Sequence, residues 1–273
     1  MKRMHSGPTP AGSGRRWRTP ALVDRDAWFP GRVIGGAALV LGPLVWWAGL
    51  FLRYLALHSG AFTAGQLAEF ARQPFAAPSQ LAAYLANPAL VTAGYACFAA
   101  GALLLWPAFA TLAHVVAARV PLLACWGGTL VVLSLFARLY FAGVDQTAFH
   151  LAASQGFDRA SDFVQANYQG ISYGPWRVAV TAHACQYLGT LLLAIGAFRS
   201  GTFGLGRCLL LLWAGTLWGG VLKAAHLADL FEYGALCLVL VPLGVRVLRD
   251  RVAELRAGPG PNGDIRSLRL LSW

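Results

Sequence analysis

The stretch Leu130–His150, LVVLSLFARLYFAGVDQTAFH, decides the fold class of this chain. It starts as an unbroken apolar run and carries Arg138, Asp145 and His150 only toward its end. An ionisable side chain inside hydrocarbon is costly, so it is normally paired, reaches the headgroups or serves a function. The stretch therefore predicts a membrane span with polar groups concentrated near one of its ends.

The composition extends this interpretation to the whole chain. Of its 273 residues, 57% are hydrophobic and 12% are charged, whereas a soluble domain carries roughly 25% charged residues. The deficit falls in six apolar runs, each near the roughly 20 residues that a helix needs to cross a bilayer. The sequence predicts an all-α, polytopic transmembrane helical bundle of about six spans, at 33–55, 90–114, 121–144, 176–198, 208–224 and 227–248.

Two of the connections between spans are long enough to form structure of their own. Residues 59–88 are too polar to span, and Thr63 and Ser79 are suited to cap two short helices at the interface or over the bundle mouth. Residues 145–175 are rich in aromatic side chains and are expected to cover the bundle. The last two spans are separated by only Ala225 and His226, where a tight turn is expected.

Charge predicts the orientation. The net charge is +11, and the Lys and Arg residues concentrate in the tails at 1–32 and 249–273. Both tails are interpreted as basic and cytoplasmic, and the first also as disordered. Sixteen of the 22 basic residues fall on the side of the tails and six on the other. Basic residues favour the cytoplasmic side and contact anionic lipid. We therefore expect a multi-pass protein of the cell membrane with both termini cytoplasmic, and no nucleic-acid partner.

The polar residues within the spans gather near the predicted outer side. Arg138 and Asp145 are seven residues apart on one helical face, too far along the axis for a simple ion pair. Arg138 and Glu232 fall at similar predicted depth, so the sequence predicts that these two pair or share a water-filled pocket. The candidate substrate-binding residues are Arg138, His183, Gln186, Asp229, His226 and Arg53.

Structural interpretations of the same residues stay open. Arg53 and Lys223 are able to extend to headgroups. Asp229 is placed to cap a helix, and His183 with Gln186 to join helices by hydrogen bonds. The Arg138–Glu232 pair is equally suited to locking the bundle.

Known intramembrane chemistries leave no signature in this chain. The motifs of lipid-phosphate phosphatases, the GxSG serine of rhomboid proteases, HExxH and a nucleotide-binding loop are all absent. The five cysteines, which lie in five different apolar segments without a CxxC, predict neither a disulfide framework nor a zinc site. Haem ligation is disfavoured because His183 has no evident mate. No metal and no cofactor are therefore predicted.

Two segments carry a family resemblance. The stretches Pro88–His114, PALVTAGYACFAAGALLLWPAFATLAH, and Leu123–Leu151, LACWGGTLVVLSLFARLYFAGVDQTAFHL, resemble six-span integral membrane proteins of high-GC actinobacteria, a family with no assigned function. The resemblance covers about residues 33–225. It implies the topology and identifies no functional residue.

These features suit three classes of function. The first is a membrane protein with an outward-facing polar pocket that binds, carries or confers resistance to a small amphipathic or lipid-like molecule. The alternative is an intramembrane acid–base enzyme, a cyclase or isomerase of an isoprenoid or lipid, with Glu232 or Asp145 as proton donor. The third is a structural or assembly partner. The expected partners are the bilayer, its anionic lipids and a small amphipathic or isoprenoid ligand, and the oligomeric state is left open.

Overall fold

The computed structural model describes residues 29–174, 177–216, 221–223 and 225–249. Most of the two predicted tails therefore lies outside the described residues. The part of the chain that is described consists of helices and their connections and contains no strand. This confirms the all-α fold.

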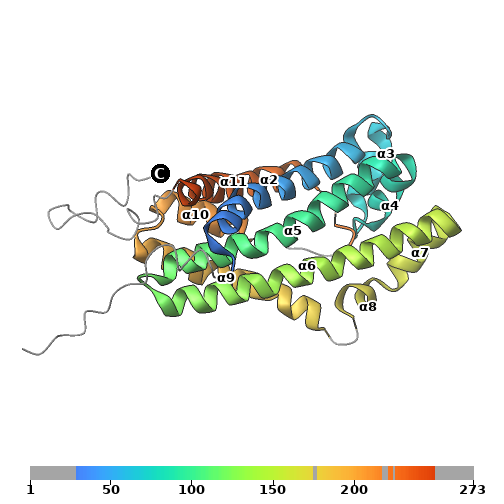
Figure 1. Cartoon of the computed structure of the whole chain (residues 1–273). Coiled ribbons are helices and arrows are strands. Elements are labelled where there is room, and N and C mark those ends of the chain that lie inside the picture. The colour runs from blue at the N-terminus through green and yellow to red at the C-terminus, as the bar shows by residue number, and fades with distance from the viewer. Residues whose placement is uncertain (1–28, 175–176, 217–220, 224, 250–273) are drawn as a thin grey trace, which may run out of the picture.

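In the described ranges, five helices are long and apolar enough to cross a membrane (Figure 1). They are α2 (Gly31–His58), α5 (Pro88–Ala117), α6 (Pro121–Gln155), α9 (Val178–Ser200) and α11 (Leu227–Leu248). Together with the shorter apolar helix α10 (Leu205–Ala214), they make a multi-pass bundle of roughly six spans. The predicted sixth span coincides with α11.

The six helices form a closed ring. In order around the ring, α11 contacts α2, then α2 contacts α5, α5 contacts α6, α6 contacts α9, and α10 joins α9 back to α11. Glycines let the neighbours approach closely. A Cβ atom on Gly49 would lie 2.6 Å from the Phe98 amide nitrogen, and one on Gly127 would lie 2.8 Å from that of Leu193.

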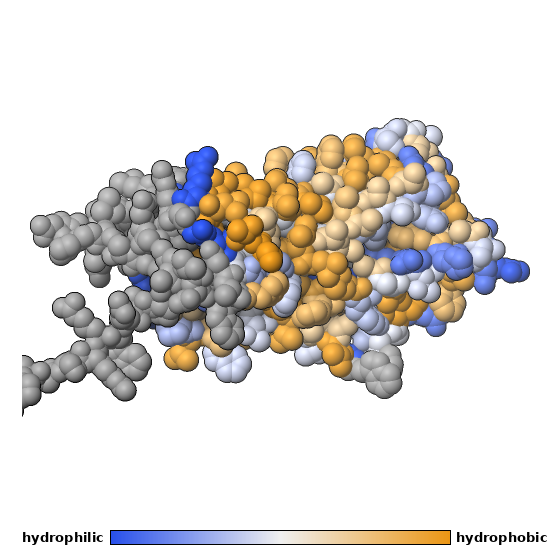
Figure 2. Space-filling model, in the orientation of Figure 1, coloured by the Kyte–Doolittle hydropathy of each residue, from blue (hydrophilic) through white to orange (hydrophobic). Residues whose placement is uncertain are grey.

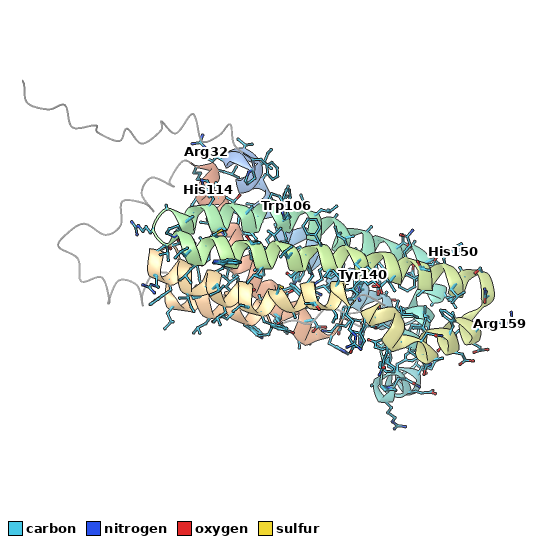
Figure 3. All side chains as sticks on the ribbon, turned by 90° about the horizontal axis from the view of Figure 1, so that it is seen from below. Arg32, Trp106, His114, Tyr140, His150 and Arg159 are labelled. Atoms are coloured by element: carbon cyan, nitrogen blue, oxygen red, sulfur yellow. The ribbon has the colours of Figure 1, made fainter. Side chains whose placement is uncertain are left out.

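The surface of the ring matches a bilayer. Figure 2 shows an apolar belt around the middle of the visible face, with hydrophilic residues toward the two ends. Leu103, Phe136 and Leu238 are each more than half exposed, which in water would be an aggregation hazard and in a membrane is a lipid-facing surface. Arg32 lies at one end of the molecule and His150 lies near the other (Figure 3).

We name the two ends of the bundle by the chain. The tail end is where α2 begins and α11 ends, and the distal end is the opposite one. Four short helices gather at the distal end (Figure 1). They are α3 (Ala64–Arg72), α4 (Ala77–Ala86), α7 (Phe157–Ala166) and α8 (Tyr168–Tyr173), and we call them the distal cap.

Aromatic pairs join the distal cap to the bundle and hold its own parts together. Tyr84 of α4 stacks on Phe149 of α6 with ring centroids 4.8 Å apart, and Phe75 stacks on Tyr168 of α8 at 4.0 Å. Thr63 caps α3 as predicted, since its Oγ1 accepts from the Gln66 amide. The prediction that Ser79 caps a helix is wrong, because α4 already begins at Ala77 and the Ser79 hydroxyl donates to the Ala76 carbonyl.

Helix α6 is longer than the predicted span. Its 35 residues correspond to about 52 Å, against a hydrocarbon thickness of about 30 Å. It continues through Asp145 and His150 because no proline occurs between its first residue, Pro121, and Gly156, whose φ of 90° ends it. The first part of the predicted connection 145–175 is therefore helical, and α6 extends into the distal cap.

The fifth span differs from its prediction. A continuous helix was expected over 208–224, but α10 ends at Ala214 after ten residues, or about 15 Å, which is half of the hydrocarbon thickness. Residues 215, 216, 221–223, 225 and 226 are not helical. The rest of the expected helix, 217–220 and 224, lies outside the described residues.

Candidate functional site at the break in the fifth span

Helix α10 ends inside the bundle, where its last carbonyl groups need hydrogen-bond donors. The last turn of any helix leaves carbonyl oxygens without an intrahelical donor. Lipid offers no replacement donors, so irregular backbone at membrane depth must be buried in protein or must line a wet cavity. Polar side chains from the neighbouring spans are therefore needed at this point.

Gln186 of α9 supplies a hydrogen-bond donor where α10 ends. Its Nε2 donates to the Gly215 carbonyl at 2.8 Å, directly after α10 ends. Its Oε1 accepts from Arg138 Nη2 of α6 at 3.0 Å. Both side chains are buried. The Arg138 guanidinium also lies 3.5 Å from the Tyr233 hydroxyl of α11 and 5.5 Å above the Trp46 ring of α2.

Asp145 and Arg53 hold the backbone nearer the distal end. Asp145 Oδ1 accepts from the Leu222 amide at 2.6 Å, and Arg53 Nη2 donates to the Lys223 carbonyl. Leu222 is fully buried and has φ 47°, in the left-handed region that non-glycine residues rarely adopt. The two ionisable side chains therefore hold the backbone on both sides of the Leu222–Lys223 peptide bond, in a conformation that costs local strain.

Arg53 also connects the break to the outer part of the bundle. Its guanidinium carbon lies 4.2 Å from the centroid of the Tyr95 ring of α5, a cation–π distance. The Tyr95 hydroxyl donates to Gln80 Oε1 of α4 at 3.3 Å. Tyr95 therefore links the broken span, α5 and the distal cap.

The predicted direct Arg138–Glu232 pair is wrong, whereas the alternative of a shared water-filled pocket stays a prediction. Within the described residues, Glu232 Oε1 accepts instead from the Thr216 hydroxyl at 2.8 Å, on the other side of the break. Successive residues of a helix point about 100° apart, so Tyr233, which is buried, turns toward Arg138 while Glu232 stays half-buried. The sixth span does supply a neighbour for Arg138, but it is a phenol.

The remaining candidate residues lie around this cluster. Asp229 takes part in capping α11, but the N-cap residue is His226 and not Asp229 as the sequence suggested. Asp229 lies at the third position of the helix, and its Oδ2 accepts from the His226 amide at 2.8 Å. His226 itself is exposed at the start of α11. His183 is fully buried, with its ring edge-on to Phe141 at 6.0 Å. It lies one turn from Gln186 along α9.

Tyr95, Tyr233 and Thr216 belong to the site but were not among the predicted residues. Each is an ordinary residue of an apolar segment by sequence. The one feature of the sequence that could have identified them is a phenol or hydroxyl group close to a predicted ionisable residue, along the chain or in a neighbouring span. Tyr233 adjoins Glu232, and Tyr95 lies in the span next to that of Arg53.

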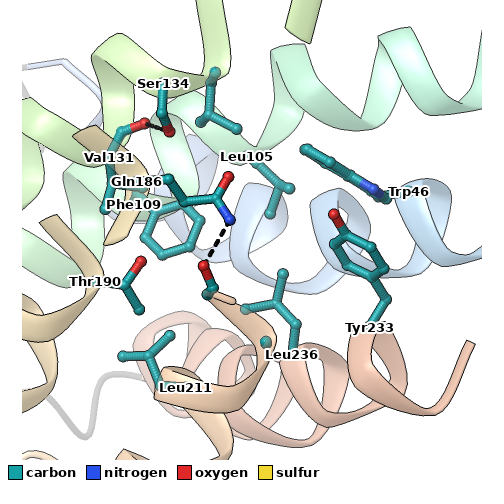
Figure 4. Close-up of a pocket in the computed structure, with 13 residues that line it drawn as sticks. Trp46, Leu105, Phe109, Val131, Ser134, Gln186, Thr190, Leu211, Tyr233 and Leu236 are labelled. Carbon is teal, nitrogen blue, oxygen red and sulfur yellow. Dashed lines mark hydrogen bonds between the residues drawn. The ribbon is translucent and has the colours of Figure 1, made fainter. Parts of the chain in front are cut away.

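A small cavity lies on the bundle axis beside the break (Figure 4). All six helices of the ring contribute to its wall, including Trp46, Phe109, Ser134, Thr190, Leu211 and Tyr233. Its volume is about 30 Å³, and one water needs roughly 10–15 Å³ by this measure. The cavity has room for about two waters and is too small for an amphipathic molecule.

A larger groove opens between α5 and α6 in the distal half of the bundle. Its volume is about 590 Å³, within the range of roughly 300–1,000 Å³ that is usual for small-molecule sites. We call it the α5–α6 groove. Its lining residues are Tyr84, Thr92, Tyr95, Ala96, Ala99, Leu139, Ala142, Gly143, Gln146, Phe149 and His150.

No group of three or more His, Cys, Asp or Glu residues in the described part of the chain is arranged to hold a metal ion. Comparison with protein-family models, curated proteins and solved structures finds no match. The resemblance to actinobacterial membrane proteins stays a prediction.

The role of Asp145 gives a first test. Asp145→Leu removes the acceptor of a buried amide and should lower the free energy of unfolding by about 1–3 kcal/mol. Asp145→Asn keeps an acceptor oxygen and should lose less. Asp162→Leu, at an exposed position of α7, is the control. Equilibrium unfolding in mild detergent measures all three, and an Asp145→Leu variant as stable as the wild type would contradict this role.

Proposed function

We propose that this protein binds a small amphipathic or lipid-like molecule in the α5–α6 groove and carries or sequesters it. The observation that supports this most is the combination of size and polarity in the groove. It is large enough for such a molecule, whereas the axial cavity, at about 30 Å³, is not.

The groove changes in polarity along its length. Thr92, Gln146 and His150 lie toward its distal end, and Ala99 and Leu139 lie deeper in the bundle. Leu139 and His150 are eleven residues apart on α6, or about 16 Å along the helix axis. A molecule with a polar head at the distal end and an apolar body toward the tail end matches this order.

Tyr95 connects the groove to the broken span. Its ring lines the groove, and Arg53, which bonds to the Lys223 carbonyl, lies against the same ring. A molecule that moves Tyr95 would act on Arg53 and through it on the break. Membrane transporters commonly place their sites beside discontinuous helices, which favours carriage over passive lipid contact.

The enzyme alternative has weaker support. Asp145 would have to donate a proton, but its carboxylate is buried, holds the Leu222 amide and does not line the groove. Glu232 bonds to Thr216 and is likewise absent from the groove wall. An acid that serves a substrate must be within hydrogen-bond reach of it.

We also propose that both termini are cytoplasmic, so that the groove faces the outer leaflet. The excess of Lys and Arg on the tail side supports this orientation. A green fluorescent protein fused to the C-terminus should fluoresce, and alkaline phosphatase at the same place should be inactive. The opposite pair of results would reverse the orientation.

The groove itself is tested by filling it. A Cβ atom on Gly143 meets nothing within 4 Å, so Gly143→Phe should fold and place a ring in the groove. Native mass spectrometry of the purified protein should show a bound mass in the wild type and at least a roughly fivefold lower occupancy in Gly143→Phe, about 1 kcal/mol of binding free energy.

Leu133→Phe provides the matched control for this experiment. Leu133 lies on the same helix, faces lipid and is 44% exposed, so the same ring there should leave the occupancy unchanged. A wild-type protein without any bound mass, or equal occupancy in all three proteins, would overturn the proposed function.

A further inference from the structure

A second cleft lies in the distal cap, away from the broken span. Its volume is about 470 Å³, and it is bounded by α3, α4 and α7. We call it the cap cleft. Its lining residues are Phe62, Gln66, Glu69, Phe70, Gln73, Pro78, Ala82, Leu85, Phe157, Ser161 and Gln165. None of them lines the α5–α6 groove, so the two sites can be tested separately.

The walls of the cap cleft are aromatic. Phe62 and Phe70 meet edge to face, with ring centroids 5.5 Å apart and an interplanar angle of 81°. Phe157 of α7 adds a third ring. All three are only half-buried, so they still have surface to offer a ligand. The faces of such rings carry negative potential and attract cations.

The charge in the cap cleft is negative. Glu69 is the one ionisable residue in its lining, and the other polar side chains there are amides and a hydroxyl. In the described structure Arg72, one turn further along α3, forms no ion pair with Glu69. The distal cap as a whole carries three carboxylates and two guanidinium groups, whereas the complete chain has a net charge of +11.

The remaining polar groups in the lining of the cap cleft include the side-chain amides of Gln66 and Gln165. Gln66 uses its Oε1 to cap α3, and Gln165 Nε2 donates to Ser161 at 2.9 Å, which leaves the Gln165 oxygen as an acceptor. A metal ion is a poor fit, since one carboxylate among phenylalanines cannot supply the six or more oxygen ligands that hard cations take. An anion would meet the Glu69 carboxylate.

We propose that the cap cleft binds an organic cation with an apolar body, of the quaternary ammonium or phosphonium type. Glu69 supplies the opposite charge, and Phe62, Phe70 and Phe157 supply cation–π contact and apolar walls. Amphipathic cations of this kind are held by ring faces together with a nearby carboxylate. This site is independent of the function proposed for the α5–α6 groove.

The test uses radiolabelled tetraphenylphosphonium and the full chain in nanodiscs of zwitterionic lipid, with empty nanodiscs as background. The wild type should bind the probe saturably. Glu69→Gln keeps the shape of an exposed side chain and removes its charge, so it should weaken binding by about tenfold. Phe70→Leu should weaken it several-fold, and neutral triphenylphosphine oxide should not compete.

Asp162→Asn is the charge-matched control, because Asp162 is an exposed carboxylate of the same cap that does not line the cleft. It should change the dissociation constant by less than about twofold. No saturable binding, or equal weakening by Glu69→Gln and Asp162→Asn, would overturn the proposal. Loss of binding in Gly143→Phe with full binding in Glu69→Gln would do so as well, by placing the probe in the α5–α6 groove.

Discussion

The backbone of a transmembrane segment has to find its hydrogen bonds within the protein, and here one segment stops being helical halfway across the bundle. Among the described residues after α10, three peptide groups are bonded by side chains instead. Gln186 donates to Gly215, Arg53 donates to Lys223, and Asp145 accepts from Leu222. Removing any of these leaves a polar group without solvent to replace its partner. The ring of helices depends on these contacts because, within the described residues, its fifth member is a helix of only ten residues.

This constraint gives the buried ionisable side chains a structural role. Arg53, Arg138 and Asp145 have the appearance of a ligand site when the sequence is considered alone. In the structure, however, they contact backbone groups, Gln186 and phenols of the protein itself. The space for a ligand lies elsewhere, in the α5–α6 groove and the cap cleft. Tyr95 joins the two regions, since it forms part of the groove and also contacts Arg53.

Much of the fold follows from hydropathy, because apolar runs of span length have few alternatives. The bounds of α11 are of this kind, while the capping of α3 by Thr63 follows from the local capping preference of threonine. The break after Ala214 is not, since the run LGRCLLLLWAGTLWGGVLKAA contains no proline and is apolar enough to be one helix. The position where α10 ends depends on contacts with side chains of other spans, and a single sequence does not show which residues of different spans are in contact. The same limit explains Arg138, whose depth was predictable while the choice between Glu232 and Tyr233 depended on helix rotation.

The central claim is that Asp145 holds the non-helical backbone of the fifth span through the Leu222 amide. Site-resolved hydrogen exchange at this amide, in nanodiscs, tests it most directly. The account predicts slow exchange in the wild type and exchange at least roughly tenfold faster in Asp145→Leu, with the amides of α11 unchanged. A Leu222 amide that exchanges at the same rate in both proteins would contradict it.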